Sequence, residues 1–265
     1  GYYDMRGGGS RVIEGVTRPE RIALFPGRGL AFVAGASGIH EFTVEPLERI
    51  GTIYETSTVD VQAVGGRYLV AVLSDLNSEV VLFDLDDPGR KPVDAGKASR
   101  LSYAVELTRA GDLYVGGWMI SPFIFQTTFD GLVSGRGIIR KKYSRFMNMD
   151  MCVLEGAGRL LVAHPLNHGV DVLDAGSLGM IREERIPTGF GAREIECDAR
   201  RGLLFSQNYF SGDVFVYDMG RKEMRNSYRT GPEIKAMEYD PETGVLYTGS
   251  RAGIFAIDAP VGYDQ

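Results

Sequence analysis

The sequence predicts an all-β fold made of six similar units of short antiparallel strands, and three observations lead to this prediction. The first is a pattern of short apolar runs bounded by Gly, Asn, Asp and Ser, which is clearest between Pro187 and Asp218. The second is a glycine before the second strand of each unit, with intervals of 37, 45, 47, 44 and 42 residues by subtraction: Gly29, Gly66, Gly111, Gly158, Gly202 and Gly244. The third is an apolar residue seven positions before each glycine, at Ile22, Val59, Ala104, Met151, Ile195 and Met237. A period in the forties with four strands in each unit is typical of a β-propeller.

The clearest unit shows how each repeat is built. Its alternating apolar and polar residues predict strands at Arg193–Cys197, Gly202–Ser206, Gly212–Tyr217 and Met224–Thr230. Third strands are expected at the matching positions elsewhere, which are Ile39–Val44, Val80–Phe83, Phe123–Gln126, Val170–Leu173 and Ile254–Ile257. Four third strands end in an aspartate that would start the following turn, so we interpret these residues as structural: Asp84, Asp174, Asp218 and Asp258.

The six units are expected to form one domain that closes into a ring. Residues 1–9 are expected to be a flexible lead-in, and residues 10–265 a single β-propeller domain. The six blades are expected at residues 17–54, 55–98, 99–145, 146–188, 189–231 and 232–260. The last unit has three strands, and an unassigned strand at residues 10–16 precedes the first unit. We therefore predict a six-bladed β-propeller with four-stranded antiparallel blades, in which the N-terminal strand completes the last blade and removes exposed sheet edges.

The charge balance and the apolar runs exclude two kinds of surface. The chain carries 29 Lys and Arg against 35 Asp and Glu, a formal net charge of −6, whereas a nucleic-acid-binding surface needs clustered Lys and Arg. The longer apolar runs, such as Tyr68–Leu73, have the length of a strand and fall short of the roughly 20 residues that a membrane helix needs. We expect no nucleic acid partner and no membrane span.

The start of the chain and its cysteines bear on where the protein functions. The chain begins at Gly1 without a charged and then apolar leader, which fits a removed signal peptide or a piece of a longer, tethered chain. We expect a periplasmic or extracellular location. Cys152 and Cys197 both fall in predicted first strands, where buried free thiols are the favoured interpretation and a disulfide or a reactive pair is the alternative.

The clearest unit resembles the YVTN-type propeller repeat, in which P-T-G is followed by P-x-x-I-A, P-D-G-x-x-x-Y-V-A-N and S-G-D-V-x-V-I-D. The matching residues are Pro187, Thr188, Gly189, Gly202, Asn208 and Ser211–Val214, with Pro19–Ala23, Leu161–Ala163 and Asp240–Gly244 in other units. Arg193–Ile195 lacks the proline of the pattern. The resemblance implies a propeller of the quinoprotein amine dehydrogenase-like or lactonase-like kind, a scaffold shared by dehydrogenase subunits, lactonases, surface-layer proteins and binding modules.

A first set of candidate binding residues lies where each first strand begins, nine residues before the glycine. This set comprises Glu20, Ser57, Ser102, Met149, Arg193 and Lys235, with Arg21, Tyr103, Asn148, Asp150 and Glu194 beside them. In a propeller these positions surround the mouth of the central channel. The mixed charges would either bind a polar ligand or pair with one another across the channel mouth.

A second set of candidate residues lies in the loops between second and third strands, which gather on the same face. It comprises Trp118, Met119, His164, His168, Tyr209, Phe210 and Arg251. Aromatic, Met and Arg side chains near water suit a protein contact. The alternative is that these side chains only cap the blades.

Two groups of residues could hold a metal ion, and each also has a structural interpretation. By resemblance to calcium-dependent gluconolactonase-like hydrolases, Ca²⁺ would be held near the channel by oxygen ligands from Glu20, Asn148, Asp150 and Glu194, with Glu233 nearby. A Cu(I) site would use Met147, Met149, Met151, Cys152, His164 and His168, but a Met-rich core is the favoured interpretation of this segment. No cofactor is predicted in the main interpretation.

These observations favour a non-catalytic recognition or scaffold module. A G-x-S-x-G motif and a phosphate-binding loop are both missing from the sequence, since Gly7–Gly9 lacks the Lys and Ser or Thr of the latter. We expect a protein partner or a small polar ligand on the loop-rich face. The alternative is a metal-dependent lactonase or other hydrolase with its site in the channel.

Overall fold

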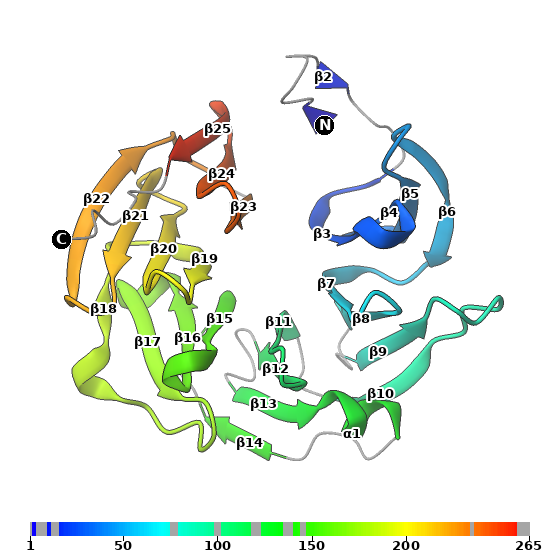
Figure 1. The fold of residues 1–265 in the computed structure, drawn as a ribbon, viewed down its shortest axis with the longest axis horizontal. Helices are drawn as coiled ribbons and strands as arrows, with labels where there is room; N and C mark the ends of the chain where they lie inside the picture. Colours follow the sequence, from blue (N-terminus) through cyan, green and yellow to red (C-terminus); the bar gives the residue numbers. More distant parts are fainter. Residues whose placement is uncertain are drawn as a thin grey trace.

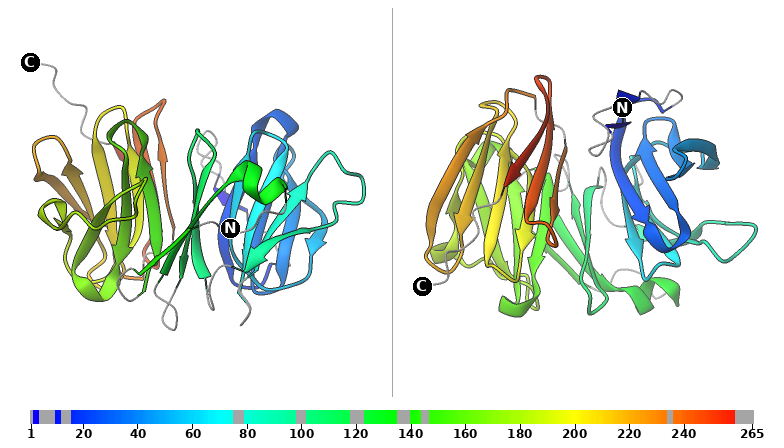
Figure 2. Two further views of the ribbon diagram at one scale, coloured as in Figure 1. Left: turned by 90° about the horizontal axis from the view of Figure 1, so that it is seen from below. Right: turned by 45° about the horizontal axis from the view of Figure 1, so that its top comes forward.

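The computed structural model describes residues 2–3, 10–11, 16–74, 79–97, 102–117, 123–134, 140–143, 147–233 and 236–258. Within these residues the chain forms a two-stranded sheet near its N-terminus and six larger sheets in chain order, each an antiparallel meander of three or four strands (Figure 1). The arrangement is the propeller-like all-β fold that the sequence predicts. Figure 2 shows the sheets standing side by side around a common axis, with the first strand of each nearest the centre in Figure 1.

We number the sheets from 1 to 6 in chain order. Sheet 1 contains β3 (Pro19–Phe25), β4 (Leu30–Gly35), β5 (Gly38–Thr43) and β6 (Glu48–Tyr54). Sheet 2 contains β7 (Thr58–Val64), β8 (Tyr68–Leu73), β9 (Glu79–Asp84) and β10 (Val93–Lys97). Sheet 3 contains β11 (Ser102–Leu107), β12 (Asp112–Gly117), β13 (Phe123–Thr128) and β14 (Arg140–Tyr143), and α1 (Phe129–Val133) follows β13.

The second half of the chain repeats the pattern. Sheet 4 contains β15 (Asp150–Leu154), β16 (Arg159–His164), β17 (Gly169–Asp174) and β18 (Ile186–Pro187). Sheet 5 contains β19 (Ala192–Asp198), β20 (Leu203–Asn208), β21 (Asp213–Asp218) and β22 (Glu223–Arg229). Sheet 6 contains β23 (Ala236–Asp240), β24 (Val245–Ser250) and β25 (Gly253–Asp258). Short 3-10 turns occupy Pro26–Arg28, Glu155–Ala157, Pro165–Asn167 and Arg182–Glu184. In the described part of the chain, no helix has the length and hydrophobicity to cross a membrane.

The glycines that mark the repeat are required by the turn between the first and second strands. All six adopt a positive φ, between 62° and 89°, a region that residues with a Cβ adopt at a cost: Gly29, Gly66, Gly111, Gly158, Gly202 and Gly244. Three of the predicted structural aspartates accept backbone N–H groups in the turn after the third strand. Asp84 accepts from Asp86, Asp174 from Ser177 and Asp218 from Arg221, at 2.8–3.0 Å.

Neighbouring sheets pack face to face through five apolar clusters. Phe32 and Phe83 lie between sheets 1 and 2, and Val162 and Tyr114 lie between sheets 3 and 4. The other clusters join sheets 2 and 3, sheets 4 and 5, and sheets 5 and 6. No such cluster joins sheet 6 to sheet 1 within the described residues, and the exposed apolar side chains there include Ile22 and Leu24 of β3 and Ile254 of β25.

The strand predicted at residues 10–16 is not seen as the fourth strand of sheet 6. Among the described residues, β2 (Ser10–Arg11) pairs with β1 (Tyr2–Tyr3), and sheet 6 contains three strands. Residues 12–15 of the predicted strand lie outside the described part of the chain. Closure of the ring by residues 10–16 and the count of six blades therefore stay predictions.

The interpretation of the two cysteines as free thiols is wrong. Cys152 in β15 and Cys197 in β19 form a disulfide, with their Cα atoms 6.0 Å apart. Cys152 lies in the apolar cluster between sheets 4 and 5, and the half-buried Cys197 packs against it. A separation of 45 residues, about one repeat, brings the two thiols face to face across adjacent first strands.

We predict that the disulfide stabilises the fold measurably. Opening a loop of this length increases the entropy of the unfolded chain, so the double variant C152A/C197A should lose about 2–4 kcal/mol of unfolding free energy. Urea unfolding of oxidised and reduced protein measures the difference. The double variant is the control, since reductant should leave it unchanged. Equal stability of oxidised and fully reduced wild-type protein would contradict the prediction.

Candidate functional site

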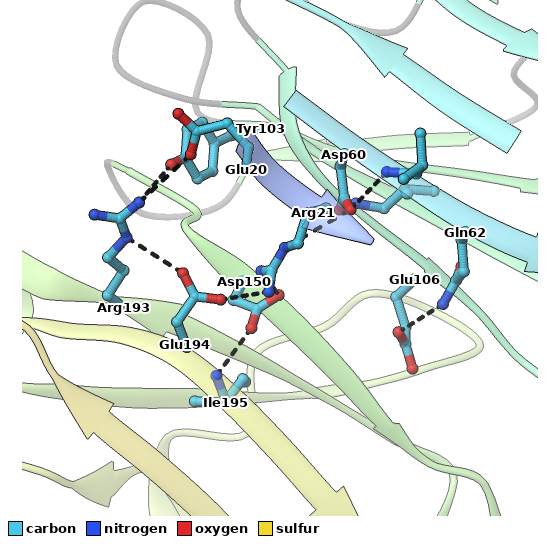
Figure 3. Close-up of polar contacts among 12 residues, drawn as sticks. Glu20, Arg21, Asp60, Gln62, Tyr103, Glu106, Asp150, Arg193, Glu194 and Ile195 are labelled. Carbon is cyan, nitrogen blue, oxygen red and sulfur yellow. Dashed lines mark hydrogen bonds and ion pairs between the residues drawn. The ribbon is translucent and has the colours of Figure 1, made fainter. Parts of the chain in front are cut away.

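The centre of the molecule is organised around the guanidinium of Arg21, which extends from β3 toward three other sheets (Figure 3). Its Nη1 lies 2.5 Å from Glu194 Oε2, its Nη2 lies 3.0 Å from Asp150 Oδ1, and its Nε lies 3.7 Å from Asp60 Oδ1. The three carboxylates come from β19, β15 and β7. We call these four residues the Arg21 cluster.

The strand register explains why these four side chains meet. Each occupies the same position in its first strand, since Arg21 is opposite Ala34, Asp60 opposite Val72, Asp150 opposite Ala163 and Glu194 opposite Gln207. Because first strands line the centre, equivalent positions converge on one level of the channel.

The aspartates of the cluster also satisfy backbone groups of the next sheet. A first strand has no neighbour on its inner side, so its inner N–H groups need other acceptors. Val105 N donates to Asp60 Oδ2 at 2.8 Å, and Ile195 N donates to Asp150 Oδ2 at 2.9 Å. Glu106 accepts in the same way from Val153 N at 3.3 Å. These bonds join sheet 2 to 3, sheet 3 to 4, and sheet 4 to 5.

Acidic groups outnumber basic ones among the described residues of the first strands at and next to the Arg21 cluster. Burial raises the pKa of Asp60 to about 6, and Arg21 opposes the shift. Burial also raises the pKa of Asp150 to about 7, with Arg21 again opposing and Glu194 adding to the rise. The pKa of Glu106 rises to about 8, through burial and then the nearby Asp150. Burial raises the pKa of Glu196 well above its ordinary value, and Glu238 of β23 adds to it.

Arg193 connects the Arg21 cluster to the loop-rich face. Its Nε lies 3.2 Å from Glu194 Oε1, and its Nη2 donates to the Tyr103 hydroxyl at 3.0 Å. The same nitrogen lies 3.9 Å from Glu20 Oε2. The guanidinium also covers the ring of Tyr209, with 5.2 Å between its carbon and the ring centroid.

A row of aromatic side chains continues outward from Tyr209, and we call it the aromatic row. Tyr209 meets Phe210 edge to face at 5.4 Å, and Phe210 stacks on Phe190 at 4.8 Å with 15° between the ring planes. Phe190 in turn lies 5.0 Å from the ring of His168. Phe190 and Phe210 are 43% and 54% exposed. The row spans three loops, whose backbones are joined by Gly191 N to Pro165 O and Tyr209 N to Gly191 O.

The structure brings most of the predicted site residues into one connected network. Those in the network are Glu20, Tyr103, Asp150, Arg193, Glu194, Tyr209 and Phe210. Arg251 lies beside it, where it pairs with Glu233 at 3.2 Å and lines a shallow cavity of about 390 Å³ with Ala236, Gly249 and Ser250. Trp118 and Lys235 lie outside the described residues.

Two predicted site residues are buried inside the sheets instead. Asn148 donates to Gly117 O at 2.8 Å between sheets 3 and 4 and is fully buried. His164 is also fully buried, with Nε2 3.4 Å from Asp171 Oδ2 within sheet 4. Neither side chain reaches the loop-rich face.

The predicted calcium ligands do not converge on one point. Asp150 and Glu194 bind the Arg21 guanidinium, Glu20 lies near Arg193, and Asn148 faces sheet 3. No group of three or more His, Cys, Asp or Glu side chains in the described residues is arranged to hold a metal ion. In the Met-rich segment, Met149 and Met151 are buried, and Cys152 is held in the disulfide.

A serine and a histidine within hydrogen-bonding distance resemble a nucleophile and its base, but the tautomer is wrong. Ser37 Oγ lies 2.9 Å from His40 Nε2, and Arg49 Nη2 lies 2.9 Å from His40 Nδ1. A guanidinium can only donate, so Nδ1 must accept and Nε2 must carry the proton. Burial and then Arg49 lower the pKa of His40, which keeps the ring neutral. His40 therefore donates to Ser37 and cannot take its proton.

Sequence reasoning missed Arg21 as the centre and did not select Asp60, Glu106 or Phe190. The sequence did contain a signal for the cluster. Arg21, Asp150 and Glu194 each directly follow the residue nine positions before the glycine of their unit, at which the first set of candidate residues was chosen. Counting back from the glycine did not find Asp60, because the turn between the first and second strands is shorter in sheet 2 than in sheet 4. Val64 is opposite Tyr68 across this turn in sheet 2, whereas Leu154 is opposite Arg159 in sheet 4.

Comparisons with known proteins define the class of fold. No family model matches the sequence, and no curated protein matches it. Among solved structures, 1482 chains match in fold. One is from the crystal structure of a nidogen/laminin complex, with a TM-score of 0.62, 13% sequence identity, and coverage of 80% of this chain and 80% of that chain. The protein therefore has a propeller-like all-β fold, which by itself assigns no activity.

We predict that the protein is more stable at mildly acidic pH than at alkaline pH. The buried acids have folded-state pKa values of about 6 to 8, above the values near 4 of an unfolded chain. The folded state therefore binds more protons over this range, and the unfolding free energy falls as the pH rises from about 5 to 9. Thermal unfolding between pH 5 and 9 measures this, and E106Q should flatten the slope. A melting temperature that rises with pH would contradict it.

We predict that removal of the Arg21 guanidinium costs more than removal of a comparable surface arginine. R21M leaves Asp60, Asp150 and Glu194 without their cation, so it should lose about 3–5 kcal/mol at pH 8. The matched control is R225M, because the two arginines are 21% and 22% exposed but, within the described part of the chain, Arg225 pairs with one acid, Asp218. Urea unfolding at pH 8 and pH 5.5 measures both, and the cost of R21M should shrink at pH 5.5. Equal costs for the two variants would refute the role of the cluster.

Proposed function

We propose that the protein is a non-catalytic recognition module that binds a protein partner through its loop-rich face. The observation that carries this proposal is the exposure of two stacked phenylalanines, Phe190 and Phe210, on that face. Exposed aromatic side chains that are already held in place lose little entropy on binding and contribute much buried apolar area. A similar chain from a nidogen/laminin complex fits a scaffold that recognises proteins.

The network beneath the row supports recognition over catalysis. Asp150 and Glu194, two acids near the channel mouth, are engaged by Arg21 and Arg193. The position at which a cation would meet these carboxylates is filled by a guanidinium. The Arg193 guanidinium also packs on the ring of Tyr209. This contact restrains the rotamers of Tyr209, which begins the aromatic row. Restrained contact residues are typical of a binding surface.

The predicted ring closure, blade count, repeat kind and location of the protein are consistent with this proposal. We propose a closed six-bladed ring of the YVTN kind, in which residues 10–16 complete sheet 6 as its outer strand and sheets 6 and 1 pack over the exposed apolar residues Ile22, Leu24 and Ile254. We also propose an exported protein, since disulfides such as Cys152–Cys197 persist in oxidising compartments. A small polar ligand at the channel mouth stays the alternative occupant, and no cofactor is proposed.

The proposal predicts that the aromatic row is needed to capture a partner. Immobilised wild-type protein and the variant F190S/F210S should be compared in extracts of the source organism, with bound proteins quantified by mass spectrometry. We expect the specific partner to fall at least tenfold with F190S/F210S. The control is I50S/M224S, which removes two side chains of similar exposure from the outer strands β6 and β22. Equal loss with both variants, or retention by F190S/F210S, would overturn the proposal.

A further inference from the structure

Three arginines lie on chain segments that adjoin the aromatic row. Arg185 donates to the carbonyl of Asn167, which precedes His168. Arg229 ends β22 opposite Asp213, and the loop of Tyr209 and Phe210 leads into that residue. Arg251 pairs with Glu233, whose N–H donates to the carbonyl of Tyr209 at 3.0 Å. The arginines therefore border the row on the loops of sheets 4, 5 and 6.

The arginines extend into solvent farther than the acids that hold them. The side chains of Arg185, Arg229 and Arg251 are 36%, 76% and 77% exposed, whereas their partners Asp171, Asp213 and Glu233 are 1%, 21% and 43% exposed. Each guanidinium has five N–H donors, and the contacts among the described residues engage one or two of them. The edge of the row therefore presents guanidinium groups that are more exposed than the carboxylates paired with them, although the whole chain carries a net charge of −6.

We infer that the loop-rich face recognises an acidic polypeptide segment in which Asp or Glu residues flank an apolar anchor. This inference rests on the proposed function and names the chemistry of its partner. The anchor packs on Phe190 and Phe210, and the flanking carboxylates pair with the outer N–H groups of Arg229 and Arg251. The cavity beside Arg251 adds room for a side chain at the edge of the row.

A polypeptide is favoured over a nucleic acid or an anionic membrane. Three bordering arginines are few for a surface that follows a phosphate backbone. A base also cannot insert between Phe190 and Phe210, because the two rings already stack on each other with 4.8 Å between their centroids.

The test is a selection of phage-displayed 12-residue random peptides on the folded wild-type protein. Enriched peptides are synthesised, and their affinities are measured by fluorescence polarisation at 50 and 300 mM NaCl. We expect Asp or Glu on both sides of Phe, Leu or Trp, and weaker binding at high salt. Both F190S/F210S and R229E/R251E should weaken binding at least tenfold. The control R221E/K222E reverses two exposed charges at the opposite end of sheet 5 and should leave binding unchanged.

The outcomes separate this inference from the function on which it rests. Peptides that lose affinity with F190S/F210S but show no acidic bias would overturn the inference and leave the recognition surface in place. Peptides that are unaffected by F190S/F210S, or a failure to enrich any peptide, would overturn both. Tighter binding of a fluorescent dT20 oligonucleotide or of phosphatidylserine vesicles, lost with R229E/R251E, would also overturn the inference.

Discussion

The fold depends on a single cation placed among buried acids. Arg21 comes from the first sheet, yet its guanidinium binds carboxylates of the second, fourth and fifth sheets. Those carboxylates would be strongly destabilising without it, because burial already raises the pKa of Asp60 and Asp150 by favouring their neutral forms. The cluster thus ties sheet 1 to the far side of the molecule, across the channel.

The Arg21 cluster matters because apolar packing does not join every pair of neighbouring sheets in the described residues. Five apolar clusters connect neighbouring sheets from 1 to 6, and carboxylates reinforce several of these contacts by accepting backbone N–H groups of the next first strand. In the described residues, no apolar cluster connects sheet 6 to sheet 1. Arg21 adds contacts from sheet 1 to sheets 2, 4 and 5 at the centre of the ring, and the Cys152–Cys197 disulfide adds a covalent link between sheets 4 and 5, which also pack face to face.

The same network supports the exposed face. Glu194 binds Arg21 on one side and Arg193 on the other, and Arg193 in turn supports Tyr209 at the inner end of the aromatic row. The row is thus supported by Arg193 at its inner end and exposed at Phe190 and Phe210, which is the combination that the proposed recognition surface needs.

The sequence alone determined the strands, the repeat and the turns, because these follow from local rules. Alternation of apolar residues placed the third strands within about two residues of their observed bounds, and the turns required the glycines that marked the repeat. It also named most members of the network, including Arg193, Glu194 and Tyr209. What only the tertiary structure decided was which of these residues meet. Arg21 became the centre because four sheets converge on it, and Cys152 met Cys197 because adjacent first strands place one thiol opposite the other. Such contacts join residues far apart in the sequence, from 39 positions for Arg21 and Asp60 (60 − 21) upward. Strand register and the curvature of the ring, which no local pattern encodes, decide whether they form.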